Sequence, residues 1–217
     1  EYMKQAVDAH KICGDGAFSQ KCRTWLENET RTSAAMLTTS CTHALEMAAL
    51  LCDIQPEDEV IMPSYTFVST ADAFVMRGAK IVFVDIRPDT MNINENLIEE
   101  AITDKTKAIM LVHYAGMVCD MDEFNKISKE FNIPIIEDAA HALGSKYDGK
   151  IVGSNSRFTC YSFQAIKQMT TVDGGAIAFL NNEDVTPARK LRWFGLDKKV
   201  SRLENDITRA GYKYGMN

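Results

Sequence analysis

Short apolar runs alternate along the chain with segments whose apolar residues recur at helical spacing. Seven runs predict β-strands: "AAMLTTS" (34–40), "EVIMP" (59–63), "KIVFVDI" (80–86), "AIMLVHY" (108–114), "IPIIEDA" (133–139), "FTCYSF" (158–163) and "GAIAFL" (175–180). The segments between them predict helices over 42–53, 69–77, 94–102 and 122–131. The strands are apolar on both faces, as buried sheets require. The alternation therefore predicts an α/β fold with a mostly parallel, seven-stranded sheet between helices.

The alternation changes after Ala139. The runs 158–163 and 175–180 are joined by a short segment without helical spacing, and this segment carries Lys167. A lysine is costly to bury unless it is paired or chemically used. The alternative is that Lys167 lays its stem on the surface and extends its charged end to solvent.

Composition narrows the class of protein. With 46% hydrophobic and 25% charged residues, the chain matches ordinary soluble globular proteins. Its net charge of −6, without a basic stripe, argues against nucleic acid as a partner. No apolar run is long enough to span a membrane, and the N-terminal residues lack a signal-peptide core, so we expect a cytoplasmic protein. The six cysteines form no C-x-x-C pair, so we expect reduced thiols.

Unusual residues follow the predicted strands, at the edge where ligands bind in such sheets. In "TTSCTHALEMAALL" a strand ends in small polar residues and a helix begins at once. The free N–H groups near Cys41, Thr42 and His43 can bind a phosphate, helped by the helix dipole. The alternative is that Ser40 or Thr42 only caps the helix.

Two further strand ends carry candidate ligand-binding groups. The run "IIEDAAH" delivers Glu137 and Asp138, and a carboxylate there can bind a metal, a ribose or a protonated ring nitrogen, or can simply cap the next segment. Phe67, in "PSYTFVST", can stack on a planar ligand or belong to the core. A metal site is disfavoured because the histidines and acids show no ligand spacing, so we expect none.

Together these groups match the needs of pyridoxal phosphate. That cofactor requires an amine for a Schiff base, a carboxylate for its pyridine nitrogen, a phosphate cradle and a stacking group. Lys167, Asp138, the turn at Thr42 and Phe67 supply all four types, and each is predicted at the same sheet edge. A plain nucleotide-binding domain is the weaker alternative, because neither G-x-G-x-x-G nor G-x-x-x-x-G-K-[ST] occurs.

Several separated motifs, in the same order, resemble one family across nearly the whole chain. They are "TSCTHALEMAALL", "EDEVIMPSYTFVST" (with Glu57 where relatives have glycine), "GAKIVFVDIRPDTMNI", "VHYAG", "IIEDAAHALGSKYDGK" and "CYSFQAIKQMTTVDGGAI". These resemble the pyridoxal-phosphate-dependent nucleotide-sugar aminotransferases of the DegT/DnrJ/EryC1/StrS family. The resemblance implies the type I fold of aspartate aminotransferase. Residues 31–217 would form its cofactor-binding large domain after an N-terminal helical segment, 1–30, and the small C-terminal domain would be absent from this chain.

The resemblance also implies roles for individual residues. Lys167 is similar to the Schiff-base lysine, Asp138 to the partner of the pyridine nitrogen, and His141 to a group near the cofactor's phenolic oxygen. The remaining cofactor-binding positions are similar to phosphate ligands or, for the phenylalanine, to the ring-stacking aromatic: Cys41, Thr42, His43, Ser162 and Phe67. Members are homodimers with shared sites, and Asn217 falls in a segment that reaches the neighbouring subunit's phosphate.

The implied reaction moves an amino group from glutamate to a nucleotide-linked 4-keto-6-deoxy sugar, as a step toward surface polysaccharide or lipopolysaccharide. Residues 14–122 resemble members that act on dTDP sugars, which favours dTDP-4-keto-6-deoxyglucose; a GDP sugar of the perosamine type is the alternative. Some members are dehydratases with histidine at the lysine position, so Lys167 favours a transaminase. A shortened, non-catalytic family member is the other alternative.

Overall fold

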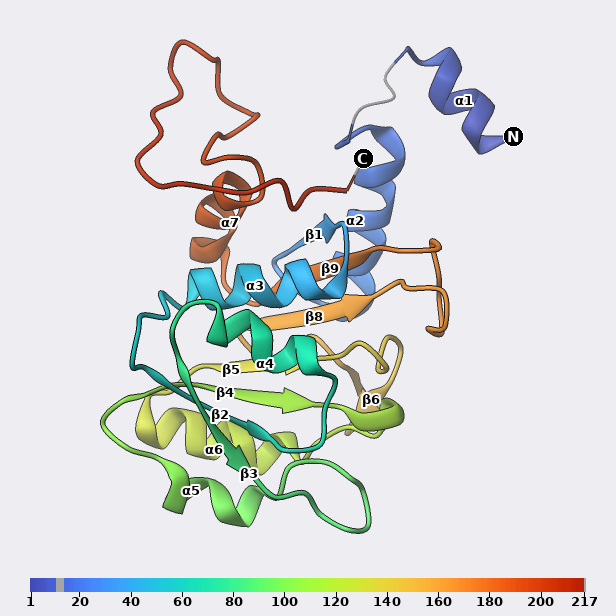
Figure 1. Ribbon diagram of the computed structural model, residues 1–217. Helices are drawn as coiled ribbons and strands as arrows, with labels where there is room; N and C mark the ends of the chain where they lie inside the picture. The colour runs from blue at the N-terminus through green and yellow to red at the C-terminus, as the bar shows by residue number, and fades with distance from the viewer. Residues whose placement is uncertain (11–13, 217) are drawn as a thin grey trace.

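A seven-stranded sheet forms the centre of the computed structural model, which describes residues 1–10 and 14–216 (Figure 1). Its strands are β1 (Ala34–Thr38), β2 (Glu59–Pro63), β3 (Lys80–Val84), β4 (Thr106–Val112), β5 (Ile135–Asp138), β8 (Phe158–Ser162) and β9 (Gly175–Phe179). Each coincides with one of the predicted runs to within a few residues, so the predicted α/β fold is confirmed. Asn217, expected near a neighbouring phosphate, lies outside the described residues.

The strand order is β1-β9-β8-β5-β4-β2-β3. Strands β8, β5, β4, β2 and β3 are parallel, and β9 runs antiparallel to both of its neighbours, β1 and β8. The segment from Phe163 to Gly174 contains no helix that could make a crossover, so the chain returns beside β8 in the opposite direction. The carboxyl ends of β1, β8, β5, β4 and β2 consequently meet at one edge.

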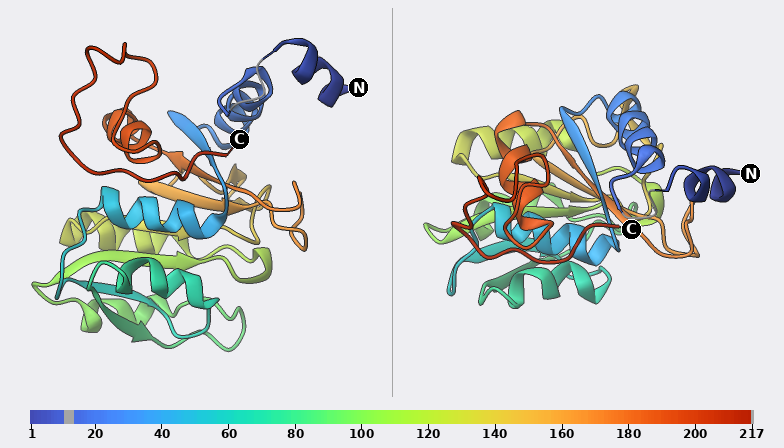
Figure 2. Two further views of the ribbon diagram at one scale, coloured as in Figure 1. Left: turned by 45° about the horizontal axis from the view of Figure 1, so that its top comes forward. Right: turned by 90° about the horizontal axis from the view of Figure 1, so that it is seen from above.

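Helices cover both faces of the sheet (Figure 2). Helices α3 (Cys41–Leu51), α4 (Val68–Val75) and α7 (Val185–Leu191) pack on one face, and α2 (Ala17–Thr30), α5 (Ile98–Ala101) and α6 (Met121–Phe131) pack on the other. Helix α1 (Tyr2–Asp8) buries no residue and extends away from the body of the molecule. Within the described ranges, we find no helix of the length and apolarity needed to cross a membrane.

Side chains that alternate along the strands supply the hydrophobic core on both faces of the sheet. Val60 and Met62 pack toward α3 and α4, whereas Ile61 between them packs toward α6. Successive strand side chains point to opposite faces, so a continuous apolar run supplies both layers. The outermost strand, β3, departs from the expectation because its Phe83 is exposed at the sheet edge.

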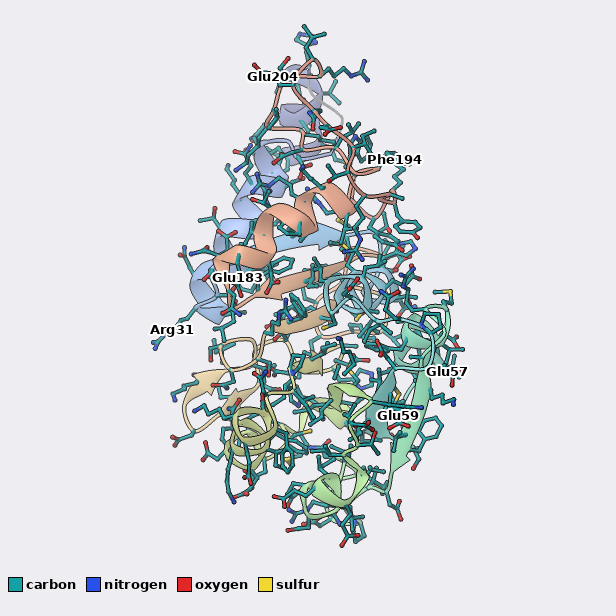
Figure 3. All side chains as sticks on the ribbon, turned by 90° about the vertical axis from the view of Figure 1, so that its left-hand side faces the viewer. Arg31, Glu57, Glu59, Glu183, Phe194 and Glu204 are labelled. Carbon is teal, nitrogen blue, oxygen red and sulfur yellow. The ribbon has the colours of Figure 1, made fainter. Side chains whose placement is uncertain are left out.

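Other local features depart from the sequence prediction. The helix expected over 94–102 divides into a 3-10 turn, Glu95–Leu97, and the short α5. Helix α7 and a small hairpin of β6 (Lys146–Tyr147) and β7 (Lys150–Ile151) were not predicted. Figure 3 shows the side chains of Arg31, Glu57 and Glu204 at the outer surface, the last on a long irregular segment that follows α7.

Candidate active site

A cavity of about 660 Å³ opens at the sheet edge where the strand ends meet. The turns that follow β1, β2, β4, β5 and β8 all contribute to its walls. It is lined by seven of the eight residues that the sequence assigned to the catalytic and cofactor-binding roles: Cys41, Thr42, Phe67, Asp138, His141, Ser162 and Lys167. The missing one is His43. The fold therefore brings together residues that are up to 126 positions apart, from Cys41 to Lys167.

The start of α3 forms one end of the cavity. The hydroxyl oxygen of Ser40 accepts the N–H of His43 at 3.1 Å, which confirms the capping interpretation for Ser40. The first N–H groups of a helix have no partner within it, so those of Cys41 and Thr42 are left to a ligand. On β8, Ser162 lies beside Gly175 in register. A Cβ on Gly175 would come within 2.5 Å of the Cys41 nitrogen, so only glycine lets β9 approach this turn.

His43 contributes to this end only through its main chain. Its imidazole lies outside the cavity and packs against the Tyr214 ring, with ring centroids 4.8 Å apart. Its Nδ1 is hydrogen-bonded to the hydroxyl of Thr39. The structure therefore places the His43 side chain away from the predicted phosphate position.

Asp138, at the end of β5, is the buried acid of the cavity. One carboxylate oxygen accepts from Thr70 on α4 at 2.8 Å, and the other accepts the N–H of Ala140 at 3.1 Å. Burial raises the pKa of Asp138 above its usual range, and these two hydrogen bonds offset the rise only in part. A cationic N–H donor placed at this carboxylate would offset the burial and keep it ionised.

Glu137 takes no part in the cavity, although the sequence brings it to the same strand end. Adjacent strand residues point to opposite faces, so Glu137 points away from Asp138. It is buried and accepts hydrogen bonds from His113 Nε2 at 2.7 Å and from Thr159 at 3.2 Å. The backbone N–H of Cys119 donates to His113 Nδ1 at 3.2 Å, so the imidazole carries its proton on Nε2. The hydrogen bond between Glu137 and His113 thus links the end of β5 to the residue that follows β4.

Lys167 reaches the cavity from the segment between β8 and β9 and is half-buried there. Its N–H donates to the carbonyl of Gln164 at 2.9 Å. The neighbouring Gln168 side chain donates to the carbonyl of His141, which ties the segment to the turn after β5. Burial, together with the positive charge of Lys167, lowers the pKa of His141, so its imidazole is neutral at neutral pH.

Cys41 is the thiol of the site. Burial raises its pKa well above the usual range, and the nearby Asp138 carboxylate raises it further. The thiol therefore stays protonated, and Cys41 acts here as a small wall residue and as a backbone donor.

Phe67 stands at the cavity mouth with 73% of its surface exposed, so the core interpretation of this residue is wrong. Two further aromatics on the wall, Tyr65 and Tyr114, were missed by sequence reasoning. Tyr65 follows the predicted strand 59–63 and Tyr114 ends the predicted strand 108–114, and that position was the signal that could have found them. Thr70, which orients Asp138, lies inside a predicted helix and gave no such signal.

The fold and the cavity define a class. A mostly parallel sheet between helices presents a lysine, a buried carboxylate and a helix start in one cavity, as in enzymes that use a cofactor with an aldehyde and a phosphate. The family model of the DegT/DnrJ/EryC1/StrS aminotransferase family matches residues 1–217. The chain belongs to this family.

The chain is also similar to individual proteins of known sequence or structure. The chain is 42% identical over 184 residues to an uncharacterized protein of Methanocaldococcus jannaschii, covering 82% of this chain and 48% of that protein. A putative sugar aminotransferase from Streptococcus pneumoniae, solved in its PLP form, superposes with a TM-score of 0.88 at 33% identity, covering 99% of this chain and 60% of that one. NtdA from Bacillus subtilis, solved with bound PMP, superposes with a TM-score of 0.90 at 28% identity, covering 99% of this chain and 48% of that one. The chain thus spans about half the length of the relatives it matches.

Proposed function

We propose that this chain carries the cofactor-binding part of a pyridoxal-phosphate-dependent aminotransferase that acts on a nucleotide-linked sugar. The observation that carries the proposal is the convergence of Lys167, Asp138 and the start of α3 on one cavity. Family membership and the sugar aminotransferases among the structural neighbours support the same conclusion.

The residues present fit the cofactor. The N–H groups of Cys41 and Thr42, with the Ser162 hydroxyl, suit a phosphate, and Gly175 keeps that corner open. The buried, hydrogen-bonded Asp138 suits a protonated ring nitrogen. When bound, pyridoxal phosphate supplies an aldehyde that takes up an amino group and a ring that accepts electrons.

The roles of the chain's own residues follow from their places. Lys167 would hold the aldehyde carbon through its amine, with loss of water, until the amine of the donor displaces it. The freed amine, which must be neutral for that step, would then move a proton as a base. Asp138 would hold a proton on the ring nitrogen. The neutral His141 imidazole would donate a hydrogen bond to the ring's phenolic oxygen, and Phe67 would stack on the ring.

The finer assignments are part of the proposal. We infer glutamate as amino donor and dTDP-4-keto-6-deoxyglucose as acceptor, because residues 14–122 resemble the dTDP-4-amino-4,6-dideoxygalactose transaminases. The products would serve surface polysaccharide synthesis in the cytoplasm. The exposed apolar residues at the cavity mouth support a homodimer.

The test is absorbance spectroscopy of the protein loaded with pyridoxal phosphate. We expect a visible band that glutamate bleaches as 2-oxoglutarate appears, and that a 4-keto-6-deoxy dTDP sugar then restores. The Lys167→Ala variant should lack the band of covalent attachment, whereas Lys190→Ala, on α7 away from the cavity, should keep it. A band that glutamate never bleaches would indicate a non-catalytic family member, and the absence of any band would refute the proposal.

A further inference from the structure

Two tyrosines form a hydrogen-bonded pair on the cavity wall. The hydroxyls of Tyr65 and Tyr114 lie 2.9 Å apart, and their ring centroids lie 4.8 Å apart with a 42° tilt between the planes. Tyr65 stands two residues after β2 and Tyr114 two residues after β4, and these strands are parallel neighbours. The two tyrosines lie just past the ends of adjacent parallel strands, which brings their rings together.

The two hydroxyls can still form hydrogen bonds with a ligand. Each phenol has one O–H donor and can also accept, and the mutual bond uses one donor and one acceptor site. Among the described residues, that bond is the one hydrogen bond that either hydroxyl makes. The bond to Tyr65 raises the pKa of Tyr114, so the Tyr114 phenol keeps its proton at neutral pH and offers a hydrogen bond rather than a charge.

Buried polar contacts hold Tyr114 in place. The side chain of Asn92, itself buried, accepts the N–H of Tyr114 at 3.0 Å and donates to the carbonyl of Met117 at 2.9 Å. Ser145 donates to the carbonyl of Gly116 at 2.9 Å. These hydrogen bonds fix the main chain of residues 113–117, so the Tyr114 phenol is already positioned when a ligand binds.

The pair lies at the opposite end of the cavity from the start of α3. Along the sheet edge the order is β8, β5, β4 and β2, so Ser162 and Tyr65 belong to strands about 14 Å apart at ~4.8 Å per strand. The rings of Tyr114 and His141 meet in an edge-to-face arrangement, with centroids 6.3 Å apart, so the aromatic wall continues from the pair to the turn after β5. The pair therefore faces the part of the cavity that a substrate enters beyond the cofactor.

We propose that Tyr65 and Tyr114 act as one unit that binds the hydroxyl-bearing ring of the amino acceptor. This inference rests on the proposed function. Aromatic faces pack against the C–H face of a sugar ring while their hydroxyls bond its oxygens. The acyclic donor glutamate carries two carboxylates, which need cationic partners, and a tyrosine side chain carries no positive charge. The pair thus distinguishes acceptor from donor.

The experiment compares Tyr65→Phe, Tyr114→Phe and the double variant in the two half-reactions. For each single variant we expect kcat/KM with the keto sugar to fall about tenfold, the loss of roughly one hydrogen bond, and the glutamate half-reaction to stay within about twofold. The double variant should lose little more than either single one, because the hydroxyls act together. Tyr147→Phe is the control, since Tyr147 bonds Asp120 outside the cavity.

A binding measurement separates this inference from the proposed function. Calorimetry with dTDP-glucose, which lacks the reactive ketone, should show about tenfold weaker binding for the tyrosine variants than for wild type and Tyr147→Phe. Failure of the wild-type protein in the glutamate half-reaction would refute the proposed function. The dTDP-glucose binding measurement would still decide the role of the tyrosine pair. Unchanged or absent dTDP-glucose binding, or an equal loss in both half-reactions, would overturn the inference.

Discussion

Asp138 shows how a single residue trades stability for function. Burial raises the pKa of its carboxyl group, so the folded, cofactor-free protein binds that proton more tightly than the unfolded chain does. Below about pH 4 the carboxyl is protonated in both states and costs nothing. As the pH rises, the unfolded chain ionises first, and the folded state loses relative stability. Under the proposed function, a bound cationic ring nitrogen would offset this cost.

We therefore predict that Asp138→Asn raises the melting temperature of the cofactor-free protein at neutral pH and leaves it unchanged near pH 4. Asparagine keeps the acceptor for the Ala140 N–H, and Thr70 can donate to Thr66 at 2.8 Å instead. Transaminase activity should fall by roughly 10²-fold or more, because the ring nitrogen loses its anionic partner. Thermal unfolding across pH checks the prediction, with the exposed Asp104→Asn as control. A variant that melts below wild type at neutral pH would contradict it.

The segment that carries Lys167 contains local backbone strain. Between β8 and β9, Val172 has φ 72°, in the left-handed region, with 80% of its surface exposed. A branched side chain is unfavourable there, at a cost of about 1–2 kcal/mol for a residue with a Cβ. A hydrogen bond supports this conformation, since the backbone N–H of Val172 donates to the side-chain hydroxyl of Thr170 at 2.9 Å. The strained residue lies five positions after Lys167.

We predict that Val172→Gly stabilises the protein, because glycine adopts this φ freely and little packing is lost. The net gain, after the extra chain entropy of glycine, should be about 1 kcal/mol, or a rise in Tm of about 2–4 °C for a chain of this size. Val200→Gly is the matched control: Val200 is also exposed but has no positive φ, so this change should lower Tm slightly. Equal losses for both variants would show that Val172 is not strained.

At the scale of elements, the sequence predicted the strands well because both faces are buried and the runs are continuous. It could not predict their order, which depends on pairing between distant segments, and so the contact of Tyr65 with Tyr114 remained hidden. Position at the end of a strand was enough to find Asp138, whereas Ser162 was found through the family resemblance. It was misleading for Glu137, where only the period of two along β5 decides which acid enters the cavity, and for the His43 ring, which turns toward Tyr214.

At the scale of the whole molecule, some of the exposed apolar side chains lie at or beside the cavity. Phe67 and Ile166 both line the cavity, and Ile166 is 82% exposed; Val68 follows Phe67 and is exposed at the start of α4. A monomer rarely leaves such residues together in water, and a second copy of the chain would cover them. This patch is the surface on which the proposed homodimer rests.

We predict that the protein forms a dimer at micromolar concentration and that Val68→Glu weakens it about tenfold or more, because a carboxylate would be buried in the contact. Glutamate suits the start of α4, so the helix itself should not be weakened. Sedimentation over a concentration series measures the dissociation constant. Leu203→Glu is the control, because Leu203 is fully open on the projecting segment beside Glu204 (Figure 3) and lies outside the patch. Wild type that sediments as a monomer throughout, or equal weakening by both variants, would show that this face is not the interface.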